Sequence, residues 1–187
     1  MKERRSARQT TSLAGQLLLA SPALREATFR RTVILLSAHD GDGAMGVVLN
    51  RPLGKQLAEL NTEFAFGPLA AVPLYAGGPV QPAQLVFVAW QWLKAEGAFQ
   101  LQFGLEPEKA AGLVGTPGVV LRAFLGYAGW GKGQLENEMK HDTWFITTVD
   151  GAQLEETDGV GLWRNLLGSV DPDLRLLANE PEDPTVN

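Results

Sequence analysis

Two apolar runs separated by a short polar stretch constrain the fold of this chain most. The first run is RTVILLSA, residues 31–38, and the second is AMGVVLNRP, residues 44–52. The HDGDG between them consists largely of residues that tolerate a positive φ, which is typical of the turn in a β-hairpin. We therefore predict a hairpin with His39 in its turn. We expect the second strand to end at Pro52, because proline cannot donate a ladder hydrogen bond.

Other apolar or alternating runs predict further strands, and polar-apolar periodicity predicts helices between them. The expected strands are 17–19, 72–76, 85–90, 98–104, 119–130 and 144–149, and the expected helices are 55–60, 107–115, 134–141 and a last helix capped at Thr157 or Asp158 and running to Leu167. Leu162, Trp163, Leu166 and Leu167 share one face of that last helix and are expected to point inward. Strands in hairpins followed by scattered helices indicate an α+β protein.

The segment GYAGWGKGQLENE, residues 126–138, is nearly a phosphate-binding loop. A phosphate loop needs a serine or threonine after its lysine to ligate Mg²⁺, and Gly133 stands there instead. Glu136 and Glu138 at the start of the following helix would also repel a phosphate. We interpret the segment as a tight strand-to-helix turn, made possible by its glycines at 129, 131 and 133, with Trp130 filling the core.

The composition favours one domain without disulfides. The 187 residues include no cysteine and carry a formal net charge of −5, which suits a cytoplasmic protein and gives no general attraction to nucleic acid. We predict a flexible basic arm over residues 1–12 and a single domain over residues 13–187. No stretch approaches the roughly 18 apolar residues of a membrane-spanning helix, so we expect no membrane partner.

Only two histidines are present, and each precedes an aspartate: His39-Asp40 and His141-Asp142. Together they could hold one metal ion if the hairpin turn met the end of the helix over 134–141. We favour the simpler interpretation, in which one is a turn histidine and the other interacts with a helix C-terminus. We accordingly predict no metal and no cofactor.

Several segments taken in order resemble the YqgE/AlgH family, a group of uncharacterised bacterial proteins. They are GQLLLASPAL, FRRTVILLSAHDGDGAMGVVLNRPL, YAGGPV, GYAGWGKGQLENE with DTWF after it, and EPEDPTVN. The resemblance runs from about Leu13 to the C-terminus. It implies an α+β fold in which a bifurcated sheet, mixed or antiparallel, curls into a pseudo-barrel with peripheral helices. It also implies that Lys132 is a variable position, and it brings the label of transcriptional regulator without a DNA-binding motif.

We expect a binding or regulatory protein that contacts a protein partner or a small ligand through a surface formed by the motifs. The candidate binding residues are Arg31, Asn50, Arg51, Gly77, Gly78, Tyr127, Trp130, Gln134 and Glu136. The aromatic pair would supply apolar contact, the arginines charge, and Gln134 and Glu136 hydrogen bonds. For each residue the alternative is structural: turns, core packing or helix capping.

Two other functions stay open. In the first, a hydrolase uses Glu136 or Asp142 as a general base, with a metal or an arginine as electrophile, and this needs a carboxylate with a raised pKa. In the second, the basic arm with Lys2, Arg4, Arg5 and Arg8 binds DNA directly, which is the least favoured function. The sequence leaves the oligomeric state and any catalytic turnover undetermined.

Overall fold

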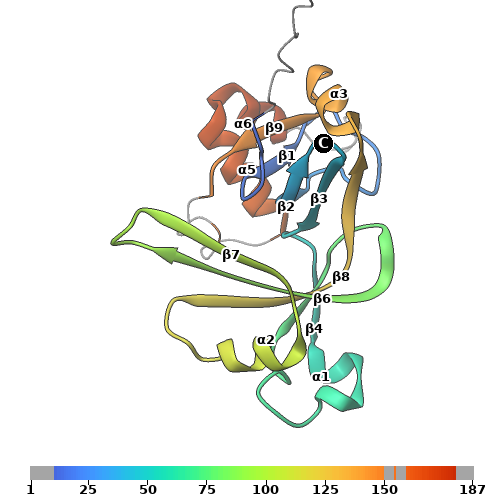
Figure 1. Cartoon of the computed structure of the whole chain (residues 1–187). Coiled ribbons are helices and arrows are strands. Elements are labelled where there is room, and N and C mark those ends of the chain that lie inside the picture. Colours follow the sequence, from blue (N-terminus) through green and yellow to red (C-terminus); the bar gives the residue numbers. More distant parts are fainter. Residues whose placement is uncertain (1–10, 150–153, 155–158, 180–187) are drawn as a thin grey trace, which may run out of the picture.

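The computed structural model describes residues 11–149, 154 and 159–179, and these residues form a mixed sheet curled into a half-barrel with helices around it (Figure 1). The strands are β1 (Leu17–Ala20), β2 (Val33–Asp40), β3 (Gly43–Val48), β4 (Pro52–Gln56), β5 (Pro73–Ala76), β6 (Val80–Leu93), β7 (Ala98–Leu105), β8 (Val119–Gly131) and β9 (Trp144–Thr147). The helices are α1 (Leu57–Leu60), α2 (Pro107–Leu113), α3 (Gln134–Lys140), α5 (Gly159–Val170) and α6 (Pro172–Ala178), with a 3₁₀ turn at Thr62–Phe64. The α+β prediction is confirmed.

The sheet divides at β8, and this division confirms the predicted bifurcation. The strand order is β4-β5-β8-β3-β2-β1-β9, and β6 joins β8 while carrying β7 on its outer edge. The first part of β8 pairs with β5 and β6, and its last part, from Ala128 to Gly131, pairs with β3. Among the strand pairs of the described residues, β5–β8 is the parallel one, and the others are antiparallel. Figure 1 shows the two resulting parts, with β1, β2, β3 and β9 above and β4 to β7 below.

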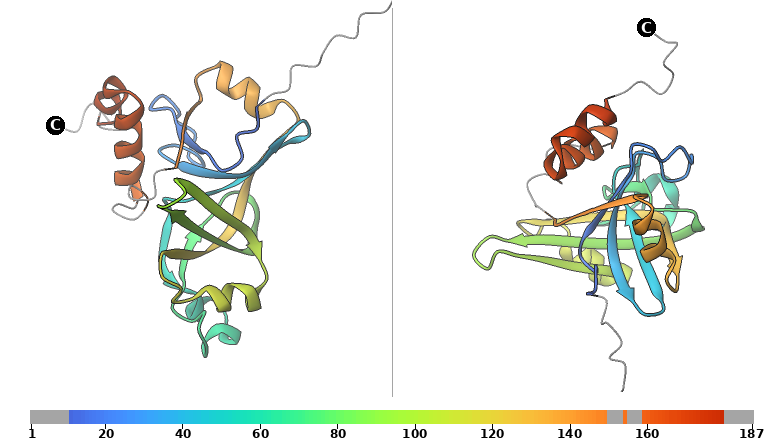
Figure 2. Two further views of the ribbon diagram at one scale, coloured as in Figure 1. Left: turned by 60° about the vertical axis from the view of Figure 1, so that its left-hand side comes forward. Right: turned by 90° about the horizontal axis from the view of Figure 1, so that it is seen from above.

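The upper part of the sheet is buried on both faces because successive side chains of a strand point to opposite faces. Leu17 and Leu19 of β1 enter one core cluster with the buried face of α5, whereas Leu18 and Ala20 enter a second cluster beside α3. Figure 2 shows α5 with α6 and α3 on opposite sides of these strands. A third cluster lies in the lower part, under α1 and α2.

The inward face predicted for the last helix is confirmed. Leu162, Trp163, Leu166 and Leu167 of α5 are all at most 1% exposed. The indole Nε1 of Trp163 donates a hydrogen bond to the carbonyl oxygen of Ala20 at 2.8 Å, which ties α5 to β1. The predicted cap at Thr157 or Asp158 lies outside the described residues.

Two expectations about the elements are wrong, one turn is shorter than expected, and one helix was not expected. Pro52 starts β4 rather than only ending the hairpin, and β4 ends where α1 begins. Strand β8 ends at Gly131, one residue beyond the expected strand 119–130, so the strand-to-helix turn is confined to Lys132 and Gly133, where Gly133 has a φ of 70°. His39 lies within β2, not in the turn. Helix α6, which Asp171 caps by accepting from the amide of Asp173, was not expected.

Most of the predicted basic arm, residues 1–12, and the closing EPEDPTVN lie outside the described residues. Ser12 is described, and its hydroxyl donates to the carbonyl oxygen of His39 at 2.8 Å. Within the described ranges, none of the helices has the length and apolar character needed to cross a membrane.

Candidate functional site

The glycines of the motifs let two stretches of backbone cross at the division of the sheet. A Cβ on Gly78 would collide with the main chain of Tyr127, and a Cβ on Gly126 would collide with the carbonyl oxygen of Gly78. Gly77 is equally confined, since its Cβ would meet the carbonyl oxygen of Gly126. Gly126 also has a φ of 70°, a conformation that side chains rarely adopt. These glycines therefore allow close packing of β5 and β8.

Asn50 joins three segments in the interior. Its Oδ1 accepts from the amide of Val33 at 2.8 Å, and its Nδ2 donates to the carbonyl oxygens of Arg31 and Gly159 at 2.9 and 3.0 Å. The residue is 4% exposed. Asn50 thus fixes the start of β2 against the start of α5 and presents no polar atom to a ligand.

The two candidate arginines have different surroundings. The guanidinium of Arg31 lies 5.8 Å from the ring centroid of Trp163, within the range of a cation–π contact. Arg51 is half-buried, and its Nη2 donates to the carbonyl oxygens of Ala27 and Arg30 at 3.1 and 3.4 Å. Burial lowers the pKa of Arg51, although the group stays a cation.

Trp130 and Gln134 meet at a residue that sequence analysis did not select, Glu138. The Glu138 carboxylate accepts from Trp130 Nε1 at 2.9 Å, from Trp144 Nε1 at 2.7 Å and from Gln134 Nε2 at 2.9 Å. Trp130 is 6% exposed and packs at an edge-to-face angle on Trp144. The Trp130 ring therefore fills the core, as the structural alternative expected.

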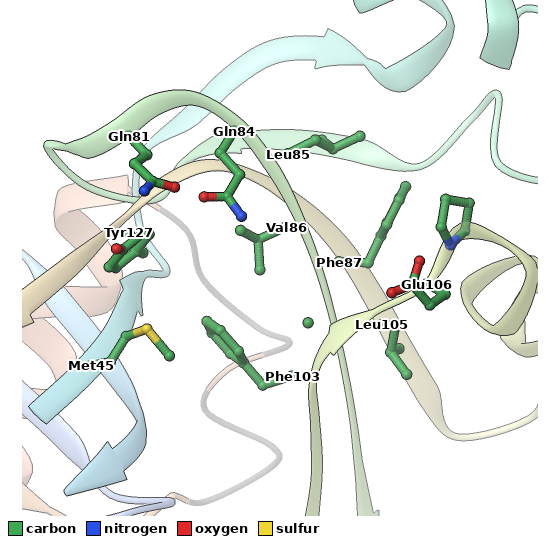
Figure 3. Close-up of a pocket in the computed structure, with 12 residues that line it drawn as sticks. Met45, Gln81, Gln84, Leu85, Val86, Phe87, Phe103, Leu105, Glu106 and Tyr127 are labelled. Atoms are coloured by element: carbon green, nitrogen blue, oxygen red, sulfur yellow. The ribbon is translucent and has the colours of Figure 1, made fainter.

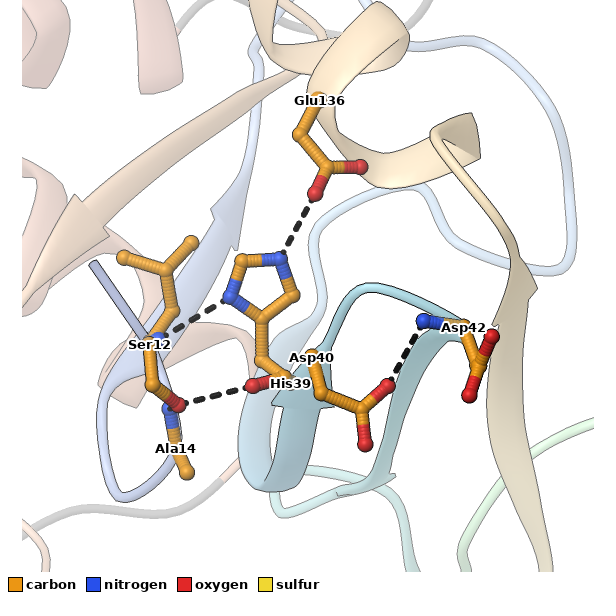
Figure 4. Close-up of polar contacts among 7 residues, drawn as sticks. Ser12, Ala14, His39, Asp40, Asp42 and Glu136 are labelled. Atoms are coloured by element: carbon orange, nitrogen blue, oxygen red, sulfur yellow. Dashed lines mark hydrogen bonds and ion pairs between the residues drawn. The ribbon is translucent and has the colours of Figure 1, made fainter. Parts of the chain in front are cut away.

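His39 and Glu136 form a hydrogen-bonded pair, with His39 Nε2 lying 3.0 Å from Glu136 Oε1 (Figure 4). The other ring nitrogen, Nδ1, accepts from the amide of Leu13 at 3.0 Å. Because Nδ1 must offer a lone pair to that amide, the ring proton resides on Nε2, which donates to Glu136. The pair links β2, α3 and the segment before β1.

The environment of Glu136 does not suit a general base. Its pKa is lowered, mainly by the hydrogen bond from its own backbone amide and then by the N–H of His39. A base that works near neutral pH needs a raised carboxylate pKa. His141 lies at the end of α3, where its Nδ1 is 2.7 Å from the carbonyl oxygen of Asn137. Among the described residues, no three or more histidine, aspartate or glutamate side chains gather to hold a metal.

A pocket of about 500 Å³ opens where β6, β7, β3 and β8 approach one another. Its lining residues are Met45, Gln81, Gln84, Leu85, Val86, Phe87, Phe103, Gly104, Leu105, Glu106, Pro107 and Tyr127. We call it the β6 pocket. Figure 3 shows Met45, Phe103, Val86 and Tyr127 around one end of it, with the Gln84 side chain directed between Tyr127 and Val86.

Irregularities in three strand pairs surround the β6 pocket. Residues 81–84 of β6 bulge away from β8, because Val80 pairs with Tyr127 and the next partner pair is Leu85 with Leu125. In β7, Gly104 is the extra residue between the Phe87–Leu105 and Val88–Phe103 pairs. The β2–β3 register shifts next to Met45. Bulges of this kind are over-represented beside binding and active sites, where they redirect side chains.

The bulge also holds Gln81 in an unusual backbone conformation, with a φ of 46°. A non-glycine residue in this region is strained, and such strain clusters at functional sites. Gln81 and Gln84 are both exposed, and their amides make no hydrogen bond to the described part of the chain. Each amide thus offers donors and an acceptor at the mouth of the pocket.

The candidate residues are divided among three places. Arg51 and Gly78 line one hollow with Ala27, Thr28, Val48, Ala76 and Pro79. Tyr127 lines the β6 pocket, on the other side of the glycine crossing. Gln134 and Glu136 lie on α3, and the structure does not bring them to either hollow.

The chain is thus an α+β protein whose sheet curls into a half-barrel, divides at β8 and has a pocket where it divides. A family model described as AlgH-like matches residues 17–175. A UPF0301 protein of Streptomyces coelicolor is 36% identical, with 96% of this chain and 97% of the relative aligned. One of Chlorobium limicola is 34% identical, with 92% and 95% aligned. The chain belongs to the AlgH-like family, so the resemblance seen in the sequence is confirmed.

Solved structures agree with the fold. The solution structure of the AlgH protein from Pseudomonas aeruginosa is 27% identical, superposes with a TM-score of 0.66 and covers 97% of this chain and all of its own (100%). A crystal structure of a Corynebacterium diphtheriae protein has a TM-score of 0.68 at 23% identity, with 95% of each chain covered. The latter likeness is one of fold alone.

Sequence analysis missed the residues of the pocket itself. Met45 and Phe103 stand in runs that predict ordinary strands, and Gln81 and Gln84 lie between the expected strands 72–76 and 85–90, where no pattern indicates a bulge. The sequence QPAQ at 81–84 was the one signal, because Pro82 breaks a strand that is otherwise continuous. His39 was considered as a turn residue or a metal ligand, but nothing in the sequence indicated its pairing with Glu136, which is 97 residues away.

Proposed function

We propose that this protein is a non-catalytic binding protein that takes a small uncharged ligand in the β6 pocket. The observation that carries the proposal is the convergence of three strand irregularities on a cavity of about 500 Å³. Ligand pockets commonly measure about 300–1,000 Å³. The volume of the β6 pocket lies within this range, and its irregular walls are typical of a binding site.

The chemistry of the walls supports a particular ligand class. Met45, Val86 and Phe103 supply apolar and aromatic surface, while Gln81 and Gln84 supply amide groups at the mouth. Among the described lining residues, Glu106 is the one carboxylate, and it lies at the start of α2. A flat, partly aromatic molecule bearing an amide or a similar neutral donor–acceptor pair complements this arrangement.

The hydrolase is the weaker alternative. Its first candidate base, Glu136, lies on α3, is held by His39 and does not line the β6 pocket. The lowered pKa of Glu136 also makes its carboxylate a weaker base. The second candidate base, Asp142, lines neither hollow. The geometry therefore favours binding without turnover.

The test is a nuclear magnetic resonance screen of uncharged aromatic carboxamides against the ¹⁵N-labelled protein. We expect binders to shift the backbone amide signals of residues 81, 83–87 and 103–106, since Pro82 has no amide hydrogen. The matched variants are Gln84→Trp, which fills the pocket mouth, and Gln100→Trp, which adds the same ring at an exposed β7 position outside it. Binding should be lost only in Gln84→Trp. A library without binders, or binders indifferent to Gln84→Trp, would contradict the proposal.

A further inference from the structure

We propose that the hollow beside Arg51 is a second, separate site that binds the carboxylate group of a small organic acid. This hollow measures about 330 Å³ and is lined by Ala27, Thr28, Val48, Arg51, Ala76, Gly78 and Pro79. It shares no lining residue with the β6 pocket. The inference therefore goes beyond the proposed function and stands on its own observations.

The first observation is the way in which Arg51 is held. Both of its hydrogen bonds to the described chain use one nitrogen, Nη2, and run to the carbonyl oxygens of Ala27 and Arg30. These bonds fix the plane of the guanidinium and leave Nε and Nη1 without a hydrogen-bond partner in the described ranges. A fixed guanidinium with remaining donors is pre-organised for a planar carboxylate.

The second observation is the balance of charge around Arg51. Glu26 is the acid that attracts Arg51, but its two oxygens accept from the backbone amides of Thr28 and Phe29 at 2.8 and 3.2 Å. No ion pair forms between Arg51 and Glu26 in the described structure. Arg30 is close enough to repel Arg51. A half-buried cation thus lacks a paired carboxylate, and a bound anion supplies one.

The walls then select among anions. Ala27, Val48, Ala76 and Pro79 surround the guanidinium with apolar surface. Arg51 is the one cation among the residues that line the hollow, and a phosphate dianion would bury two charges against these walls at a cost in desolvation. A monocarboxylate brings one charge, and its apolar body can contact the walls. The geometry consequently points to a small aromatic or aliphatic monocarboxylic acid.

Calorimetric titration with benzoate, in buffer low in chloride, tests this site. Benzamide is the uncharged control ligand of the same shape, and it is compared in Gln84→Trp because the wild type is expected to bind aromatic carboxamides in the β6 pocket. In that variant we expect benzamide to bind at least about tenfold more weakly than benzoate, because charge-assisted hydrogen bonds are the stronger ones. Arg51→Gln should weaken benzoate binding by a similar factor. Arg25→Gln removes a cation from the same loop without touching the hollow, and should change affinity by less than about threefold.

Two further variants make the result unambiguous. Ala27→Leu fills the hollow from an exposed position while leaving Arg51 and its hydrogen bonds, so it should also abolish benzoate binding. Gln84→Trp blocks the β6 pocket and should leave benzoate binding unchanged, which separates this site from the proposed function. Absence of benzoate binding to the wild type, equal binding of benzamide and benzoate to Gln84→Trp, or benzoate binding that survives Ala27→Leu would each overturn the proposal.

Discussion

His39 Nε2 donates a hydrogen bond to Glu136 Oε1 at 3.0 Å and thereby joins β2 to the first turn of α3. The histidine side chain is 4% exposed and the glutamate side chain 29%. Through Nδ1 the same ring holds the amide of Leu13. One imidazole thus connects three segments that are distant in sequence, and the carboxylate fixes its orientation.

The stability of the folded protein depends on pH through Glu136. Because the folded-state pKa of Glu136 is lowered, the unfolded chain binds a proton more readily than the native protein does. The stabilisation is therefore present above the ordinary glutamate range, about pH 4.3, and is lost as pH falls through the lowered pKa. We expect the urea midpoint of the wild type to fall more steeply below about pH 4.5 than that of Glu136→Gln. Parallel curves for the two proteins would contradict this assignment.

Glu138 should contribute more to stability than its position on a surface helix suggests. Glu138→Ala removes the acceptor of two indole N–H groups, those of Trp130 and Trp144, in a part-buried site. Leaving both unpaired should cost about 2–4 kcal/mol of unfolding free energy. Glu138→Gln keeps one acceptor oxygen and should recover part of the loss. Urea unfolding followed by tryptophan fluorescence measures the unfolding free energy of both variants. If Glu138→Ala unfolds with the same free energy as the wild type, these contacts contribute no net stability.

The buried side chain of Asn50 gives a further prediction about stability. Asn50→Ala should cost about 2–4 kcal/mol, because the buried amide of Val33 loses its partner. Asn50→Asp keeps that acceptor but turns an oxygen toward the carbonyls of Arg31 and Gly159, so it should be at least as damaging. Exposed Asn61 supplies the control, with Asn61→Ala costing about 1 kcal/mol or less. If Asn50 were a ligand contact, its substitutions would leave thermal stability near that of the wild type.

The glycine crossing predicts that a glycine-to-alanine substitution costs much more stability at Gly126 than at Gly41. Gly126→Ala places a methyl group against the carbonyl oxygen of Gly78 at a φ of 70°, and should cost at least about 3 kcal/mol or prevent folding. Gly41→Ala, in the hairpin turn, meets no atom within 4 Å and should stay within about 1 kcal/mol of the wild type. Soluble yield and circular dichroism of the two variants decide the matter. Equal behaviour would mean that the crossing tolerates side chains.

Local patterns predicted most elements of the fold. The runs that became β2, β3 and β6 are apolar enough to be read directly, and the four buried residues of α5 follow helical spacing. Other elements depend on distant partners. Gly129 and Gly131 were interpreted as part of a turn, but both pair with β3 and belong to β8. Tertiary hydrogen bonding here outweighed local preference.

The candidate site was predictable only in part. The motifs named residues that do meet, such as Gly77, Gly78 and Tyr127, yet their contact is mostly backbone against backbone. The pocket arises from bulges, whose positions depend on pairing register and not on residue type. That is why Tyr127 was the one candidate residue that lines the β6 pocket.

The methionine methyl groups test the central claim, ligand binding in the β6 pocket, most directly. The chain has three methionines. Met45 lines the pocket, whereas Met139 packs on the core cluster beside α3 and serves as an internal control. With ¹³C-methyl-labelled protein and a saturating aromatic carboxamide, we expect the Met45 signal to move and to show contacts to the ligand while Met139 stays unchanged. A binder that leaves Met45 unchanged would contradict the account.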